Sequence, residues 1–400
     1  MGSLHEEYFA CLALRYTPGL GPKSWSPILR HYSSAYKALK DAANWPSLAF
    51  ASEKSSVAAL KEVWRAKAEK EYREAVRAGF GILPWTHHQF PVLLKELPDP
   101  PTCLYYYGDP ELLGNPAVGI VGSRNSGRLG LEYASKIAAD LAKFGVTVVS
   151  GFAKGIDSCA HEAALTGIGS TIAVLGTGLD VESYPPDSAW LRNSVIQSGL
   201  ILSEFPPGTK PFARNFPFRN RLISGLSVGV LVVEAGIASG SLITARLAAE
   251  QGREVMAMPG PIGDSSFAGC LKLIKEGASL VETAEDVLIS IKHALDTSVL
   301  KKTAGEEHKL PAKKVARTPV KQVSAPEPVE AAVPPVDLAG LEPPELDIAR
   351  ALDVGGKLHI DEIARTAGVD VSVAGAVILG MEVKGMVVRF PGMYYDLRRS

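Results

Sequence analysis

The segment at residues 210–221 combines positive charges with aromatic rings at close spacing. It reads KPFARNFPFRNR and interleaves four cations, Lys210, Arg214, Arg219 and Arg221, with three phenylalanines, Phe212, Phe216 and Phe218. Guanidinium and ammonium groups bind phosphate oxygens, and aromatic rings accept unstacked bases. The combination predicts a segment that binds single-stranded nucleic acid, with Arg219 as the first candidate for a DNA contact. The alternative is that the rings belong to a hydrophobic core and the arginines are merely solvated.

Four further stretches place glycine and serine directly after short apolar runs. Small residues let backbone N–H groups approach a phosphate, and a helix that starts there adds its positive end. Arg124 in the first stretch and Lys154 in the second each add a cation. The alternative is that the glycines simply form tight turns between strands and helices. The four stretches are 122–127, 150–157, 176–180 and 234–241, and their candidate phosphate-binding residues are Gly122, Ser123, Ser150, Gly151, Gly155, Ser239, Gly240 and Ser241.

Catalytic and cofactor sites have weaker support than phosphate binding. The first turn, GIVGSRNSG, lacks the GxGxxG spacing of a dinucleotide site, and the second predicted strand does not end in an acidic residue that could bind a ribose hydroxyl. Glu234, beside the SGS turn, could serve as a general acid or base, as in a nucleotide phosphoribohydrolase of the lysine-decarboxylase-like group. For the isolated His161 we expect a structural role, and for Asp157 a helix cap. We therefore expect a binding protein without catalytic residues, cofactor or metal.

A parallel sheet is needed to bring these turns together. From residue 117 onward, short β-branched runs alternate with helical stretches, which is typical of βαβ units. Ligands of such sheets lie at the carboxyl ends of the strands, where the turns occur. The sequence predicts an α/β fold with a Rossmann-like, doubly wound, mostly parallel sheet. We expect its strands at 117–121, 146–149, 171–175, 200–202, 228–233 and 254–257, and its helices at 129–143, 157–166, 187–197, 217–226, 241–251 and 267–276.

The core should extend over residues 79–295 and be preceded by a helical domain at 1–78. The first 78 residues are rich in Ala, Leu, Lys and Glu, with a sharp break at TPGLGP. Residues 79–116 are rich in proline and predict a connecting extension of the core. Residues 296–341 are dominated by Pro, Ala, Val, Lys and Glu without an apolar period, so we expect a disordered linker.

Residues 342–400 predict a winged-helix domain. The pattern indicates three short helices and a two-stranded wing at 386–390 and 393–397. The expected recognition helix at 371–384, VSVAGAVILGMEVK, has almost no side chains that read base edges. A protein contact or an accessory role is therefore favoured over a transcription regulator that reads one duplex sequence.

The composition predicts a folded chain in a reducing compartment. Hydrophobic residues make up 46% and charged residues 21%, close to the globular average. The formal net charge of -1 says little, because nucleic-acid affinity depends on local cation clusters. The four cysteines form no CxxC pair, and the sequence shows neither a signal-peptide pattern nor an apolar stretch of membrane length. We expect a cytoplasmic protein that does not contact the membrane.

Eight sequence motifs occur in the order found in the DNA-processing protein A family, also called DprA or Smf. They are GSR at 122–124, SGFAKGID at 150–157, GTGLD at 176–180, SEFPPG at 203–208, FPFRNRLISGLS at 216–227, VVEA at 232–235, SGSLITA at 239–245 and GREVMAMPG at 252–260. The sequence resembles this family over about 119–278. Its N-terminal TPGLGPKSW is similar to the hairpin of a helix-hairpin-helix or SAM-like domain, although a purely architectural turn would look the same.

The resemblance implies a protein that binds single-stranded DNA without sequence specificity in a basic pocket. It further implies a homodimer formed through the Rossmann-like core, which hands the protected strand to the RecA recombinase during natural transformation. The family's pocket residues correspond here to Arg124, Lys154 and the block 219–221. Together with the turns, the predicted DNA-binding residues are Gly122, Ser123, Arg124, Ser150, Gly151, Lys154, Gly155, Phe216, Arg219, Asn220, Arg221, Ser239, Gly240 and Ser241.

Overall fold

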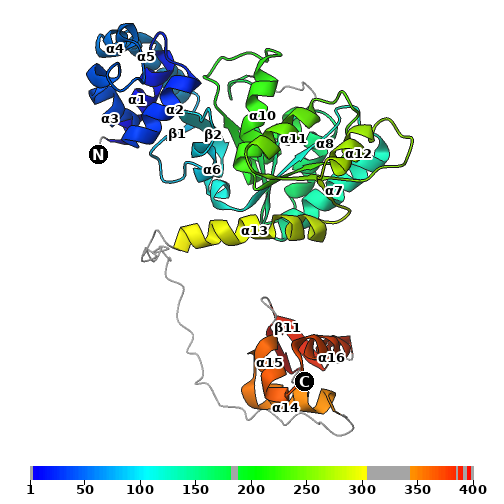
Figure 1. The fold of residues 1–400 in the computed structure, drawn as a ribbon. Helices are drawn as coiled ribbons and strands as arrows, with labels where there is room; N and C mark the ends of the chain where they lie inside the picture. The colour runs from blue at the N-terminus through cyan, green and yellow to red at the C-terminus, as the bar shows by residue number, and fades with distance from the viewer. Residues whose placement is uncertain (1–2, 182–187, 304–342, 384–385, 391–393, 398–400) are drawn as a thin grey trace, which may run out of the picture. The chain divides into compact units, whose positions relative to one another are not determined.

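A nine-stranded sheet forms the centre of the first of two structural units (Figure 1). The computed structural model describes residues 3–181, 188–303, 343–383, 386–390 and 394–397. The chain divides into one unit of Met1–Lys309 and another of Leu310–Ser400. Each unit has buried hydrophobic side chains of its own, so each is described by itself.

The sheet is mostly parallel, with two antiparallel strands at one edge. Its strand order within the described residues is β1-β2-β6-β5-β4-β3-β7-β8-β9. Neighbours from β6 to β9 pair in parallel, whereas β1 pairs antiparallel with β2 and β2 with β6. The chain winds outward from β3 in one direction and then from β7 in the other, which confirms the predicted doubly wound α/β fold. The strands are β1 (Gly81–Pro84), β2 (Cys103–Gly108), β3 (Ala117–Val121), β4 (Thr147–Ser150), β5 (Thr171–Val174), β6 (Leu200–Ser203), β7 (Gly229–Val232), β8 (Glu254–Ala257) and β9 (Ser279–Leu280).

Helices cover both faces of the sheet, because side chains of a buried strand alternate between its two faces. In β3, Val118 and Ile120 pack with α7, α8 and α13, whereas Ala117 and Val121 pack in the core that also holds α9 to α12. This winding brings the turns after β3, β4, β5 and β7 to one edge of the sheet. The helices are α7 (Arg128–Lys143), α8 (Ile156–Ala164), α9 (Ala189–Ser198), α10 (Asn215–Leu226), α11 (Ser241–Glu250), α12 (Ala268–Lys275) and α13 (Ala284–Thr303).

The N-terminal helices lie beside the antiparallel edge of the sheet (Figure 1). They are α1 (Leu4–Tyr16), α2 (Pro22–Tyr32), α3 (Ala35–Lys40), α4 (Glu53–Leu60) and α5 (Arg65–Arg77). The hydroxyl groups of Tyr8 and Tyr105 lie 2.9 Å apart, and the Trp25 indole donates to the Pro100 carbonyl at 3.0 Å. The helical character predicted for residues 1–78 is present, and these helices share one hydrophobic core with the sheet.

The second unit contains the three helices and the wing that the sequence predicts. The helices are α14 (Glu345–Gly355), α15 (Ile360–Ala367) and α16 (Val371–Val383), and the strands are β10 (Leu358–His359), β11 (Val387–Phe390) and β12 (Tyr394–Leu397) in the order β10-β12-β11. The two-residue β10 was not predicted. In the first unit, α13 continues to Thr303, through the first residues of the predicted linker. The remainder of that linker, residues 304–341, lies outside the described residues.

Candidate nucleic-acid interface

The turns after β3 and β4 pack directly against each other. The Ile156 N–H donates to the Ser123 carbonyl at 3.2 Å. Gly155 has a φ of +80°, and a Cβ atom there would lie only 2.9 Å from the Arg124 carbonyl oxygen. Glycine is therefore required at this crossing, both for its conformation and for its small size. The close approach places the turn that carries Lys154 beside the turn that carries Arg124.

Arg124, Phe216 and Arg219 form a cluster at the carboxyl edge of the sheet, called here the Arg124 cluster. The guanidinium carbons of Arg124 and Arg219 lie 5.9 and 6.0 Å from the centre of the Phe216 ring. The ring also contacts Gly176 after β5, where a Cβ atom would come within 3.0 Å of Phe216 Cδ1. Arg124 and Lys154 are both exposed. The structure thus combines cations with an aromatic ring at the end of β3, β4 and β5.

Arg219 is buried, in contrast to the solvent-facing DNA contact that the sequence predicts. Its side chain is 4% exposed, and its guanidinium donates to the carbonyls of Gly151, at 2.6 Å, and Val174. Burial lowers the pKa of Arg219 to about 10, while Asp157 opposes that shift. The group therefore keeps its charge at neutral pH. Arg219 connects α10 to the ends of β4 and β5 through these hydrogen bonds. Its positive charge lies next to the Phe216 ring.

Asp157 and Glu234 bind several of the backbone N–H groups that the sequence predicts for phosphate. The buried Asp157 carboxylate accepts from the N–H groups of Gly151 at 3.1 Å and Ala153 at 3.4 Å. Burial raises the pKa of Asp157. The prediction of a helix cap is wrong for Asp157, because the N-cap of α8 is Gly155 and the Asp157 carboxylate, in the first turn of the helix, binds the preceding loop instead of the N–H groups of the helix. The loop N–H groups already have acceptors, which leaves the side chains of Arg124 and Lys154 as the accessible cationic donors of the two turns.

Glu234 binds the start of α7. Its side chain is 1% exposed, and its carboxylate accepts from the Gly127 N–H at 3.1 and 3.2 Å, while its carbonyl accepts from the Ser123 N–H at 2.7 Å. Burial raises the pKa of Glu234. The Gly127 N–H belongs to the first N–H groups of a helix, which have no partner within the helix, and the carboxylate supplies its acceptor. The geometry gives Glu234 a structural role at the start of α7, in place of the general acid or base that its position in the sequence allows.

The prediction of Arg221 as an accessible phosphate contact is wrong. Arg221 points away from the Arg124 cluster. Its side chain is buried, where it forms ion pairs with Glu204 and, at 3.2 Å, with Asp99. Its guanidinium carbon lies 4.2 Å from the centre of the Phe218 ring. The neighbouring Asn220 accepts from Arg219 Nε at 3.2 Å. Of the block 219–221, Arg219 alone lies against Phe216 in the contacts described.

The SGS turn lies at the start of α11, after the strand next to β3. The hydroxyl groups of Ser239 and Ser241 are 2.7 Å apart, and the Ser241 N–H donates weakly to Ser239 Oγ at 3.4 Å. Gly240 is exposed. Ser150, in contrast, is buried at the end of β4 and donates to the Ile120 carbonyl at 2.5 Å. The Ser150 hydroxyl therefore links β4 to β3, whereas the SGS turn remains a candidate ligand contact.

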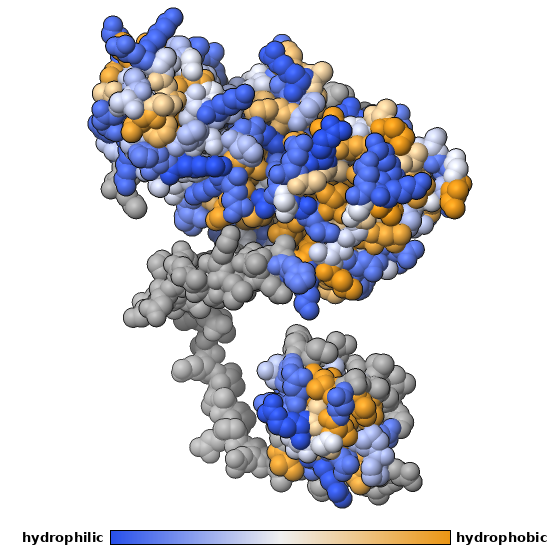
Figure 2. All heavy atoms as spheres, viewed as in Figure 1, coloured by the Kyte–Doolittle hydropathy of each residue, from blue (hydrophilic) through white to orange (hydrophobic). Residues whose placement is uncertain are grey.

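Exposed aromatic and basic residues precede and begin α10, and they are not among the predicted DNA-binding residues. Phe212 and Phe218 are 50% and 38% exposed, and Arg214 lies 5.5 Å from the Phe212 ring. Hydrophobic residues are interspersed with hydrophilic ones over the face of the first unit seen in Figure 2. The signal was present in the sequence, because these residues belong to the KPFARNFPFRNR segment.

His161 lies in the core of the first unit. His161 is buried, its Nδ1 lies 2.7 Å from Thr171 Oγ1, and burial lowers its pKa to about 3. A neutral histidine in the core agrees with the structural role predicted for it. Among the described residues, no group of His, Cys, Asp and Glu side chains could hold a metal ion, and no helix is both long and apolar enough to span a membrane.

Comparison with known proteins places the chain in a family. The model for "DNA recombination-mediator protein A" matches residues 81–292, and the model for "DprA winged helix domain" matches residues 332–393. The protein Smf of Escherichia coli (strain K12) is 38% identical over 321 residues, which are 80% of this chain and 78% of that protein. The DNA processing protein DprA of Streptococcus pneumoniae is 47% identical over 199 residues, which are 50% of this chain and 70% of that protein.

The solved structure of DNA processing protein A from Streptococcus pneumoniae aligns with a TM-score of 0.62 and 36% sequence identity. The alignment covers 70% of this chain and 97% of that one. The first family model spans more than half of the chain, and the sheet and the wing described above carry the matched regions. The chain therefore belongs to the DNA recombination-mediator protein A family, with the winged-helix domain of that family in its second unit.

Proposed function

We propose that this protein binds single-stranded DNA without sequence preference at the carboxyl edge of its sheet. Arg124 and Lys154 bind phosphate groups from two adjoining turns, and the Phe216 ring stacks on a base. The observation that carries the proposal is the Arg124 cluster, in which the Phe216 ring lies about 6 Å from an exposed and from a buried guanidinium. Aromatic rings and cations of this kind bind unpaired bases and backbone regardless of sequence.

Membership in the family supports a proposal for the biological step. The protein acts in the cytoplasm, forms a homodimer through the Rossmann-like core, protects the incoming strand during DNA uptake and delivers it to the RecA recombinase. Gly122, directly after β3, and the SGS turn, whose Gly240 is exposed after the neighbouring strand β7, extend the binding edge. RecA filament formation on single strands is the measurement for delivery, because a delivering protein accelerates it and an Arg124→Ala protein does not.

The binding site is tested by titrating labelled single- and double-stranded oligonucleotides in fluorescence anisotropy. Arg124→Ala should weaken single-strand affinity on the order of tenfold and reduce the slope of log affinity against log salt by about one. The matched control is Arg128→Ala, because the Arg128 side chain is 91% exposed only four residues away and pairs with Glu132. Equal affinities for the Arg124→Ala and Arg128→Ala proteins would exclude the proposed site.

A further inference from the structure

Phe218 presents an exposed ring whose other side lies on a buried cation. The Arg221 guanidinium carbon is 4.2 Å from the ring centre, and the Phe205 ring meets Phe218 edge-on at 6.1 Å. Phe218 is nevertheless 38% exposed. An aromatic ring held on a guanidinium is attracted to it by the negative face of the π system. The ring is therefore fixed before any ligand arrives, and the part not covered by Arg221 and Phe205 faces solvent.

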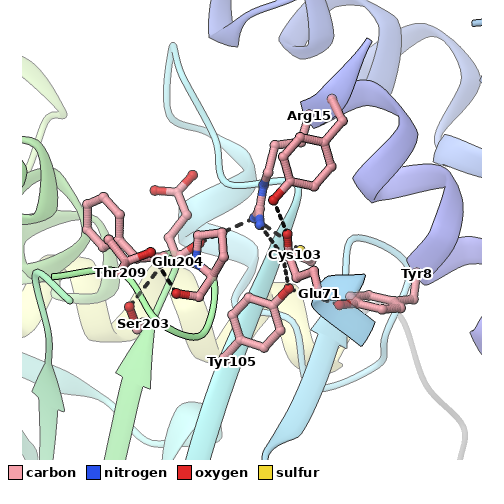
Figure 3. A network of polar contacts seen from close by, with 11 residues as sticks. Tyr8, Arg15, Glu71, Cys103, Tyr105, Ser203, Glu204 and Thr209 are labelled. Carbon is pink, nitrogen blue, oxygen red and sulfur yellow. Dashed lines mark hydrogen bonds and ion pairs between the residues drawn. The ribbon is translucent and has the colours of Figure 1, made fainter. Parts of the chain in front are cut away.

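A buried polar network holds Arg221 in this position, and Figure 3 shows its members Arg15, Glu71 and Glu204. Arg221 pairs with Glu204, whose backbone carbonyl accepts from Arg15 Nη2 at 3.3 Å. Arg15 in turn pairs with Glu71 at 2.7 Å. Glu71 is 2% exposed and Glu204 is 8% exposed. Because buried charges persist only when paired, this network fixes α10 against α1 and α5.

We infer that Phe218 is a second base-stacking position of the single-strand site and that Arg221 positions its ring. The inference rests on the proposed function. Phe218 and Phe216 belong to the same helix, two residues apart, so they project from different sides of its first turns. The exposed Lys210 and Arg214 precede this helix. The positive charge of these two residues favours a partner that carries phosphate groups. A phosphate backbone is therefore favoured over another protein as the partner of the exposed rings.

A base on Phe218 would extend the binding site from the Arg124 cluster toward the N-terminal helices. Arg221 then acts through the ring and does not touch phosphate, which explains why a guanidinium in a basic segment is buried. The network around Glu204 connects this position to α1, so the N-terminal region contributes to DNA affinity without contacting the strand. Stacking on one aromatic side chain contributes ~1–3 kcal/mol per base, roughly a 5- to 150-fold change in affinity.

The first test compares aromatic and aliphatic replacements in anisotropy titrations of the full chain with oligo-dT. Phe218→Leu should weaken affinity on the order of tenfold, whereas Phe218→Trp should retain it. Phe144→Leu is the matched control, because Phe144 is 55% exposed at the end of α7 that leads to the start of β4, at the opposite edge of the sheet. Equal affinity of the Phe218→Leu and Phe144→Leu proteins would overturn the inference. If Arg124→Ala weakens binding while Phe218→Leu does not, the proposed function stands and this inference fails.

The second test separates positioning by Arg221 from a general loss of structure. Arg221→Met should weaken affinity in the wild-type background but have little further effect in the Phe218→Leu background, because contacting residues are not additive. An equal loss in both backgrounds would contradict positioning through the ring. A 2-aminopurine base in the oligonucleotide gives a direct signal, since stacking on Phe218 quenches its fluorescence and Phe218→Leu should restore it at one position. If Arg221→Met does not fold, the Leu and Trp pair and the fluorescence still decide whether Phe218 stacks on a base.

Discussion

Two buried carboxylates give the turns at the binding edge their shape. Asp157 accepts from the N–H groups of the turn after β4, and Glu234 accepts from the start of α7. Each carboxylate therefore occupies donors that would otherwise face an anion. The backbone groups therefore hold the turns in shape, and the cationic side chains of the two turns, Arg124 and Lys154, are exposed at the surface.

The buried Glu234 predicts a pH dependence of stability. Burial raises its pKa above the ordinary value of 4.5, so the folded protein binds this proton more tightly than the unfolded chain. The free energy of unfolding should consequently fall as pH rises from 4.5 through the folded pKa. Glu234→Gln keeps an acceptor for the Gly127 N–H but has no proton to release. Urea unfolding of both proteins over this range should show their difference changing with pH, and a constant difference would contradict the prediction.

At the scale of single residues, the sequence predicted which residue types of α10 lie at the site. It did not predict that Arg219 and Arg221 point toward buried partners. The KPFARNFPFRNR pattern correctly brought Arg219 and Phe216 together, and the motif spacing brought Arg124 to the same edge. Burial of Arg219 and Arg221 was not visible, because their partners are the carbonyls of Gly151 and Val174 and the carboxylate of Glu204, which come from distant strands. Such contacts depend on tertiary packing, which a local charge pattern does not report.

At the scale of elements, the site depends on how closely the turns after β3 and β4 approach. The chain at Gly155 passes against the carbonyl groups of Ser123 and Arg124, so a methyl group there would push the two turns apart. This crossing also sets the distance between the two exposed cations. The element that positions the site is thus a pair of turns and not a single phosphate-binding loop.

Gly155→Ala should therefore cost more than its backbone conformation alone requires. A left-handed helical conformation costs an alanine about 1 kcal/mol, and Gly155, with φ +80° and ψ −126°, lies in the mirror-β region that glycine alone adopts readily. Gly252 provides the control, because its φ is +68° and an added Cβ atom would meet nothing within 4 Å. We expect Gly252→Ala to lower the free energy of unfolding by about 1 kcal/mol and Gly155→Ala by more than about 3 kcal/mol, with weaker single-strand binding. Chemical denaturation and anisotropy provide the measurements, and equal losses would show that steric contact is unimportant.

The parallel strands were predictable because they are short, buried and rich in β-branched residues. The bounds of β3 and β8 agree with the prediction, and those of β4 to β7 differ by one residue at one or both ends. β1, at Gly81–Pro84, was missed because its segment contains the Gly and Pro of a typical loop. Its pairing with β2 supplies what the local pattern lacks, since register is fixed by a partner some 20 residues away.

At the scale of the whole molecule, the proposed binding site belongs to one unit. The Arg124 cluster, the SGS turn and Phe218 all lie within Met1–Lys309. The second unit has a separate core that includes Ile348, Ile363 and Ile378. Its helix α16, VSVAGAVILGMEV, carries one charged residue, a glutamate, so it offers little attraction to phosphate.

A chain that ends at Lys309 should consequently keep its affinity for single-stranded DNA within about threefold of the full chain, a difference of less than 1 kcal/mol. The physical reason is that the deleted unit supplies none of the cations or rings of the proposed site. Anisotropy titrations at two salt concentrations provide the measurement, and Arg124→Ala in the shortened chain should cause the same loss as in the full one. A tenfold fall in affinity on truncation, with the salt slope also reduced, would instead assign phosphate contacts to the winged-helix domain.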